Sequence, residues 1–149
     1  MSDTLKNQIT ENIVYHARLV GKNEHLLDVA ERLGVAGSDL FHSNVYCNLL
    51  ECHAGTPELA ADIIRDLLLH VRKFEKSFDE YSGNFRARTV FDGVTVEVTY
   101  GPGGACHVRK VTETTVVPEH TVERTRFVRE GNCEPLLDDS HCKFGDGTE

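Results

Sequence analysis

The sequence predicts an α+β fold in which N-terminal helices, one of them long, pack on a C-terminal antiparallel β-meander of about four strands. The helical part is indicated by apolar residues at every third or fourth position from Thr56 to Gly83, which is the spacing of one helix face. After Gly83 the apolar residues alternate with polar ones around an Asp-Gly pair, as they do in strands. The chain therefore divides into a helical part, residues 3–83, and a β-meander, residues 84–130.

Three shorter helices are predicted before the long one. The first begins near Asp3 and is interrupted at Gly21. The second ends at Gly34, which can supply the left-handed residue that stops a helix. The third runs from Ser38, a good capping residue, to about Cys52. Each of the three has apolar residues on one face and can contribute to a common core.

The long helix is predicted over residues 57–82. Thr56 is a favourable N-cap, Pro57 suits the first helical position, and Gly83 can end the helix. Its apolar stripe consists of Ala60, Ile64, Leu67, Val71, Phe74, Phe78 and Tyr81. We expect this stripe to lie at the centre of the core, against the apolar face of the sheet.

The clearest local signal is the Asp92-Gly93 pair between two alternating segments. Asp-Gly favours the two-residue type I′ turn that joins the strands of a hairpin. Folding about this pair fixes which residues face each other across the two strands. The predicted cross-strand pairs are Phe91–Val94, Thr89–Val96, Ala87–Val98, Phe85–Tyr100 and, on the other face, Arg88–Glu97.

Two further strands are predicted over residues 106–117 and 122–130, around a bend at Pro118. Their alternation is poor, and a bulge near Arg109 would restore its phase. Residues 131–149 are acidic and rich in Gly and Asp. We therefore predict a single domain over residues 1–130 and an acidic flexible tail over 131–149.

The composition indicates a soluble protein of the cytoplasm. A formal net charge of −8 favours solubility and disfavours non-specific attraction to nucleic acid or to anionic membranes. No apolar stretch approaches the ~18 residues of a membrane span, and the polar N-terminus does not resemble a signal peptide. Five cysteines, an odd number, then predict reduced thiols in the cytosol.

Residues 25–40 resemble the first half of a helix-turn-helix, with Gly34 at the turn. In this alternative, residues 25–52 belong to a DNA-binding regulator. The side chains that would contact base edges are His42, Asn44 and Asn48. The stretch from Gly34 to Ile63 contains no Lys or Arg, although basic side chains supply most of the affinity for DNA. Duplex DNA is therefore not the favoured partner.

A zinc-stabilised domain or a metal-dependent enzyme is the second alternative. The candidate ligands are Cys47, Cys52, His53, Cys133 and Cys142. No C-x-x-C pair is present, and an isolated cysteine is commonly a small buried apolar residue. A row formed by Asp62, Asp66 and His70 on the long helix lies opposite the apolar stripe, where solvent is expected. We expect neither a metal nor another cofactor.

Arginines at alternating positions indicate a basic strip on the solvent face of the sheet. The candidate partner-binding residues are Arg86, Arg88, Arg109, Arg124 and Arg126. Acidic residues on neighbouring strands would neutralise much of this charge. Without a convergent catalytic set, the sequence predicts a non-enzymatic interaction protein that binds another macromolecule, most simply another protein. Regulators, adaptors and inhibitors, including viral inhibitors, belong to this class, and a dimer through the apolar helix surface is a further option.

Overall fold

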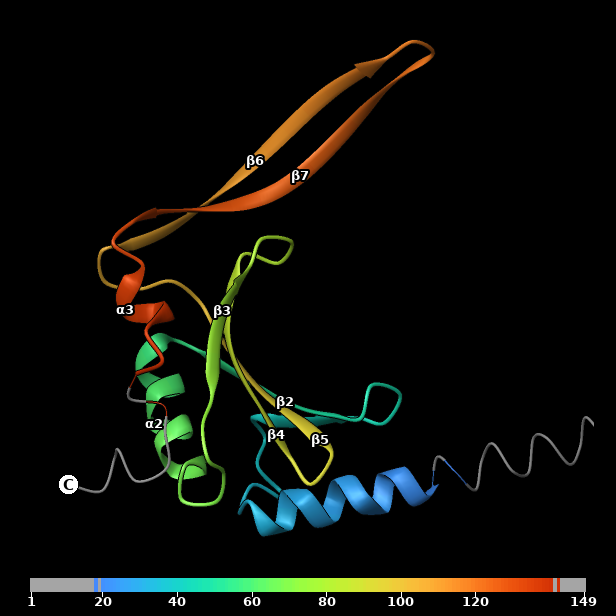
Figure 1. The fold of residues 1–149 in the computed structure, drawn as a ribbon, viewed down its shortest axis with the longest axis vertical. Helices are drawn as coiled ribbons and strands as arrows, with labels where there is room; N and C mark the ends of the chain where they lie inside the picture. Colours follow the sequence, from blue (N-terminus) through green and yellow to red (C-terminus); the bar gives the residue numbers. More distant parts are fainter. Residues whose placement is uncertain (1–17, 19, 141, 143–149) are drawn as a thin grey trace, which may run out of the picture.

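The computed structural model describes residue 18, residues 20–140 and residue 142. The described strands form a five-stranded mixed sheet of order β1-β2-β5-β4-β3 and a separate two-stranded sheet of β6 and β7. The two-stranded sheet extends away from the rest of the molecule (Figure 1). The predicted long helix packed on a four-stranded meander is therefore wrong, because most of the regular structure is strand and the strands belong to two sheets.

Residues 20–32 are helical in the described chain and run without a break through Gly21. The predicted interruption at that glycine is therefore wrong, and the start of the predicted first helix lies outside the described residues. Leu26, Val29 and Leu33 are buried along one face of this helix. Gly34, with φ of 75°, follows its end as predicted.

Strands β1 (Phe41–Asn44) and β2 (Leu49–Gly55) replace the predicted third helix. They pair in antiparallel fashion, and the turn between them contains Asn48 with φ of 52°. Leu50, Cys52 and Ala54 are buried, whereas the residues between them are at least partly exposed. The alternation is that of a half-buried strand. The second helix that a helix-turn-helix requires is consequently absent from residues 41–55.

Helix α2 (Pro57–Leu67) begins where the sequence predicts and ends far earlier. The Thr56 hydroxyl accepts a hydrogen bond from the Leu59 backbone N–H at 3.2 Å, which caps the first turn. After the helix the chain turns and enters β3 (Glu75–Asp79), which pairs with the next strand. The prediction of one helix over residues 57–82 is therefore wrong beyond Leu67.

Strands β4 (Asn84–Phe91) and β5 (Val94–Tyr100) form the hairpin that the sequence predicts. Asp92 and Gly93 have φ of 50° and 77°, as a type I′ turn requires. All five predicted cross-strand pairs are confirmed: Phe91–Val94, Thr89–Val96, Ala87–Val98, Phe85–Tyr100 and Arg88–Glu97. The other edge of β5 pairs in parallel with β2, which makes the sheet mixed.

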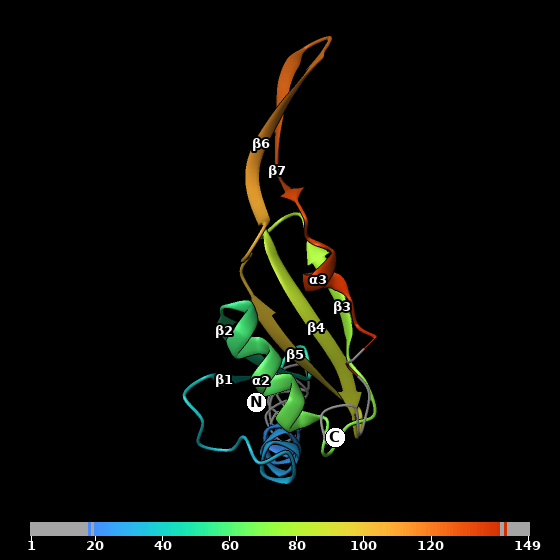
Figure 2. The same cartoon turned by 90° about the vertical axis from the view of Figure 1, so that its left-hand side faces the viewer.

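A single apolar core lies on one face of the five-stranded sheet and is covered by α2 and the helix of residues 20–32 (Figures 1 and 2). The sheet contributes Leu50, Cys52, Phe85, Ala87, Val94, Val96, Val98 and Tyr100, among others. The opposite face is polar, and one register row across it contains His42, Glu51, Glu97, Arg88 and Glu75. We call the five-stranded sheet together with these two helices the body.

Strands β6 (Cys106–Val117) and β7 (His120–Gly131) pair with each other from end to end, with Cys106 opposite Gly131 and Val117 opposite His120. Their register has no shift, so the predicted bulge near Arg109 is wrong. We call this two-stranded sheet the ribbon. Helix α3 (Glu134–Leu137) follows it, in the segment predicted to be a flexible tail.

Candidate interaction surface

The distal part of the ribbon, residues 112–126, is exposed on both faces. Each of its residues is exposed except Val117 and Val122, which are half-buried, and the side chain of Val116 is 80% exposed. Two views at right angles show this part extending away from the body (Figures 1 and 2). Each strand of the ribbon has an outer edge beside which no described strand lies, and such edges offer backbone donors and acceptors to another chain.

Ion pairs on one face of the ribbon hold its two strands together. Arg109 Nε lies 2.5 Å from Glu130 Oε1, and Arg126 Nη2 lies 2.8 Å from Glu113 Oε1. Arg124 is opposite Glu113 in the register, and no ion pair of Arg124 is present in the described part of the chain. Of the candidate arginines on the ribbon, Arg109 and Arg126 are thus engaged, and the charge of Arg124 is available.

The base of the ribbon is fixed to the turn between β3 and β4. The Phe127 backbone N–H donates to the Glu80 carbonyl at 2.7 Å. A Cβ added at Gly83 would lie only 2.8 Å from the Phe127 ring, so a glycine is needed for this close approach. The Arg129 guanidinium lies 5.4 Å from the centre of the Phe78 ring. The orientation of the ribbon is therefore set by packing against the body.

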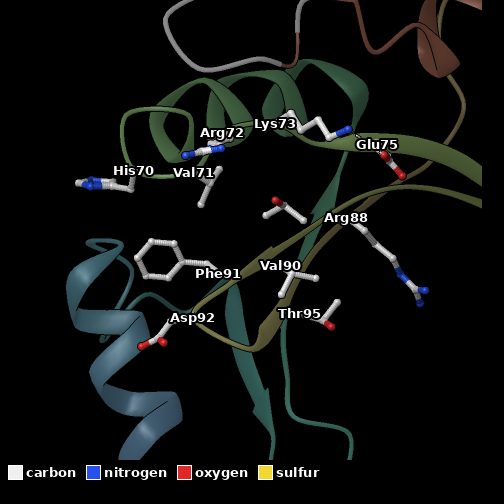
Figure 3. A pocket seen from close by; sticks show the side chains of 11 residues that line it. His70, Val71, Arg72, Lys73, Glu75, Arg88, Val90, Phe91, Asp92 and Thr95 are labelled. Atoms are coloured by element: carbon white, nitrogen blue, oxygen red, sulfur yellow. Dashed lines mark ion pairs between the residues drawn. The ribbon is translucent and has the colours of Figure 1, made fainter.

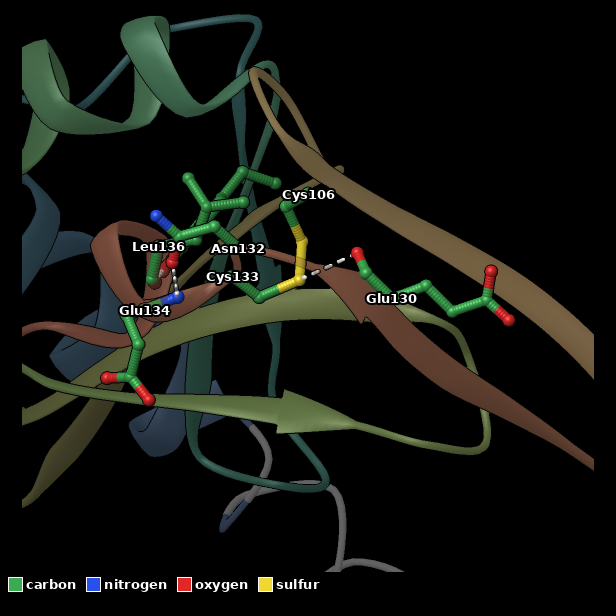
Figure 4. The surroundings of a disulfide bond; sticks show 7 residues. Cys106, Glu130, Asn132, Cys133, Glu134 and Leu136 are labelled. Carbon is green, nitrogen blue, oxygen red and sulfur yellow. Dashed lines mark hydrogen bonds between the residues drawn. A yellow bond between two sulfur atoms is a disulfide. The ribbon is translucent and has the colours of Figure 1, made fainter.

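A disulfide between Cys106 and Cys133 closes the base of the ribbon (Figure 4). The prediction that all the cysteines are reduced is therefore wrong for this pair. Reduced cysteines were one reason to predict a cytoplasmic location. That location stays a prediction, now without this reason. The two half-cystines flank the ribbon in nearly symmetrical positions about Pro118, which is the sequence signal that could have revealed the bond.

The described residues after the ribbon, 132–140 and 142, are held against the body. The Tyr100 hydroxyl donates to the Leu136 carbonyl at 2.6 Å, and burial raises the pKa of Tyr100. Cys142 is buried, and its carbonyl accepts a hydrogen bond from the Phe74 N–H at 2.8 Å. The first part of the predicted tail is thus packed and hydrogen-bonded, and residues 143–149 lie outside the described chain.

Arg86 and Arg88 lie on the polar face of the body, apart from the three ribbon arginines. Arg88 Nε is 2.8 Å from a carboxylate oxygen of Glu97, whose side chain is only 9% exposed. Arg86 contacts both Glu97 and Asp79, at 3.9 and 3.6 Å. The two arginines neutralise a nearly buried carboxylate. The structure therefore does not unite the five predicted arginines in one strip.

The residues predicted to contact DNA belong to β1 and its turn instead of a helix. The Asn48 side-chain amide donates to the Gly93 carbonyl at 2.7 Å, and the Asn44 side-chain oxygen accepts from the Cys47 N–H at 3.2 Å. The His42 ring lies 5.9 Å from the ring of His53. Both asparagines thus stabilise turns in the body.

The predicted metal ligands are not brought together in the described structure. Cys133 is in the disulfide, Cys52 and Cys142 are buried, and Cys47 is exposed in the β1–β2 turn. His53 is on the polar face of β2, opposite to Cys52. Burial raises the pKa of the Cys52 thiol to about 11, so it stays protonated at neutral pH. Of the predicted acidic row, Asp62 and Asp66 are on α2, whereas His70 is in the turn after it.

One group with the composition of a cation site occurs among the described residues: His25, Asp28 and Asp92. Arg32 already contacts it, because its Nε lies 3.1 Å from Asp28 and its Nη2 binds Asp92. The hydrogen bond from Arg32 lowers the pKa of Asp92 below its ordinary value of 3.8. The guanidinium supplies the positive charge that a metal ion would otherwise bring, and it joins the helix of residues 20–32 to the β4–β5 turn.

Most of the apolar stripe that was considered for a dimer is inside the chain, whereas Tyr81 at its end is 80% exposed. Ala60, Ile64, Leu67, Val71 and Phe74 are all buried in the core. Within the residues that the structure covers, no helix is both long and apolar enough to cross a membrane. Comparisons with protein-family models, curated proteins and solved structures found no match.

Proposed function

We propose that this chain is a non-enzymatic interaction protein that binds another protein through the distal ribbon, residues 112–126. The supporting observation is that no described residue covers either face or either outer edge of this long two-stranded segment. A two-stranded hairpin alone is at best marginally stable in water. A partner that covers a face or pairs with an edge would stabilise it, and edge pairing would give affinity through backbone hydrogen bonds.

The side chains of the ribbon favour a protein partner over a nucleic acid. Residues 106–131 contain five Lys or Arg and four Glu, so their electrostatic attraction for phosphates is weak. Two of the arginines are held by Glu113 and Glu130. The distal part is rich in Thr and Val, which suit strands, with Arg124 available for a carboxylate.

A shortened variant tests this proposal. Residues 112–125 are replaced by Asn-Gly, because Val111 and Arg126 are cross-strand partners and a two-residue turn can join them. The body and the disulfide remain in this variant, so we expect an unchanged core. In affinity capture from the cells in which the protein occurs, proteins enriched on the full chain should be lost from the shortened variant.

A second test variant is the full-length Arg124→Glu chain, which keeps the ribbon and reverses one exposed charge. We expect it to bind the captured protein roughly tenfold more weakly, the change that about 1.4 kcal/mol produces. Amide exchange supplies a direct readout, since the outward-facing amides of residues 112–125, which are not bonded between β6 and β7, should become protected when the partner is bound. Equal capture by the full chain and the shortened variant would refute the proposal.

A further inference from the structure

A second surface, independent of the ribbon, lies where β4 extends beyond its partner β3. The last cross-strand pair of these strands is Glu75 with Arg88. Beyond it, residues 89–91 pair with β5 and with no other described strand, because the chain before Glu75 turns away from the sheet. The space between that segment and the end of β4 is a groove of about 730 Å³, which is within the range of ligand-binding pockets (Figure 3).

The backbone of Val90 is directed at this groove. In a two-residue hairpin the residues next to the turn, here Phe91 and Val94, form a hydrogen-bonded pair. Hydrogen bonding then alternates along β4, so the N–H and C=O of Val90 point away from β5. The register gives Val90 no partner on that side among the described residues, and Val90 is 68% exposed. An extended peptide could therefore pair with β4 at this residue.

The side chains around the groove favour an acidic peptide. Val90 and Phe91 contribute apolar surface, and the charged lining includes Arg72, Lys73 and Arg88. Arg72 has no ion pair within the described residues. Figure 3 shows these side chains, with those of residues 70–73 on one side of the groove and those of β4 on the other.

The neighbouring carboxylates do not cancel this positive charge. Glu75 is paired with Lys73 at 3.3 Å, where both groups are mostly exposed. Asp92 is bound by Arg32 from the other side of the turn. The positive charge of Arg72 is thus available to a ligand, and arginine binds carboxylates in a planar, two-point geometry.

We infer that this groove binds a short extended segment of a partner protein, in which acidic and apolar residues alternate. The segment continues the line of β3 beside β4 and pairs with the backbone of Val90. Its apolar side chains contact Phe91, and its carboxylates contact Arg72. The chemistry is that of strand addition combined with charge complementarity.

Fluorescence anisotropy with three labelled peptides tests the inference. The first alternates Glu and Val, the second alternates Lys and Val, and the third is the first with its central Val replaced by Pro. We expect saturable binding of the first, with a Kd between about 10 μM and 1 mM, and at least roughly tenfold weaker binding of the other two. The Lys peptide tests the charge, and the Pro peptide tests the backbone hydrogen bonds.

Two variants of the full chain locate the binding. Arg72→Glu reverses the available charge, and Val90→Pro removes the outward N–H without removing a bond to β5. Each should weaken binding of the Glu-Val peptide by roughly tenfold. The charge-matched control Arg65→Glu, on the exposed side of α2, should bind it as the original chain does, and so should the shortened ribbon variant. Equal binding of the Glu and Lys peptides, or binding that neither groove variant weakens, would overturn the inference.

Discussion

Removal of the disulfide at the base of the ribbon should destabilise the whole molecule. The bond joins residues 27 positions apart, and the chain-entropy relation for a loop of that length gives about 12 cal/mol/K, or about 3.5 kcal/mol at 25 °C. The bond acts mainly by restricting the unfolded chain, so the effect should appear even though the strand ladder already closes the same loop in the folded state. Cys106→Ala/Cys133→Ala should therefore lower the free energy of unfolding by about 3.5 kcal/mol.

Urea unfolding followed by circular dichroism measures this change. With a slope of about 2 kcal/mol/M, the midpoint should fall by roughly 1.8 M. Reduction of the unmodified protein should produce a similar shift without any substitution. Cys47→Ser, at an exposed thiol, is the control and should leave the midpoint unchanged. The prediction is refuted if the double variant differs from the original chain by less than about 0.5 kcal/mol in the free energy of unfolding and reductant leaves the urea midpoint of the original chain unchanged.

Three further predictions concern the body. Phe74 is 1% exposed, so Phe74→Ala should lower the free energy of unfolding by about 3–5 kcal/mol in the same urea assay, and a near-neutral result would contradict the described core. A thiol reagent at neutral pH should modify Cys47 rapidly and Cys52 only after unfolding, and rapid modification of both would show that β2 is not buried. Because the pKa of Asp92 is lowered by Arg32, its ionised form stabilises the fold above pH 3.8, and this contribution is lost as the pH falls through the lowered pKa. Arg32→Ala should thus reduce the melting temperature near neutral pH and have a smaller effect in acid, and an equal effect at both would count against this ion pair.

Local signals in the sequence predicted the structure best where neighbouring residues decide the outcome. The β4–β5 hairpin follows from the Asp92-Gly93 turn, which fixes the register of the strands on either side of it. The start of α2 follows from its capping residue Thr56. Both features depend on contacts only a few positions apart in the chain, which a single sequence displays directly.

The long helix illustrates why the other elements were not predicted. The stripe residues Val71 and Phe74 are buried, as their spacing suggests, but they lie in the connection that leads to β3. Residues 75–79 pair with β4, and that tertiary pairing outweighs their local preference. The parallel pairing of β2 with β5 joins segments about 45 residues apart, and no local pattern specifies it.

The candidate surfaces were predicted only in part for the same reason. Alternating arginines identified positions on polar sheet faces, yet the strands that carry Arg86 and Arg124 belong to different sheets. The groove beside Val90 exists only because β3 begins at Glu75, opposite Arg88, and does not extend alongside residues 89–91 of β4. This is a property of the assembled sheet. The disulfide likewise depends on the ribbon register that brings Cys106 near Cys133.

The length of the ribbon determines how the molecule should move and scatter in solution. Strands of 12 residues span about 40 Å, which is close to the diameter expected for an entire compact domain of this size. The protein should consequently diffuse more slowly than a sphere of equal mass, and its small-angle scattering should show a maximum dimension well above that of a globule. A partner that holds the tip would sit a domain's width from the core, leaving the groove beside β4 open to a second protein.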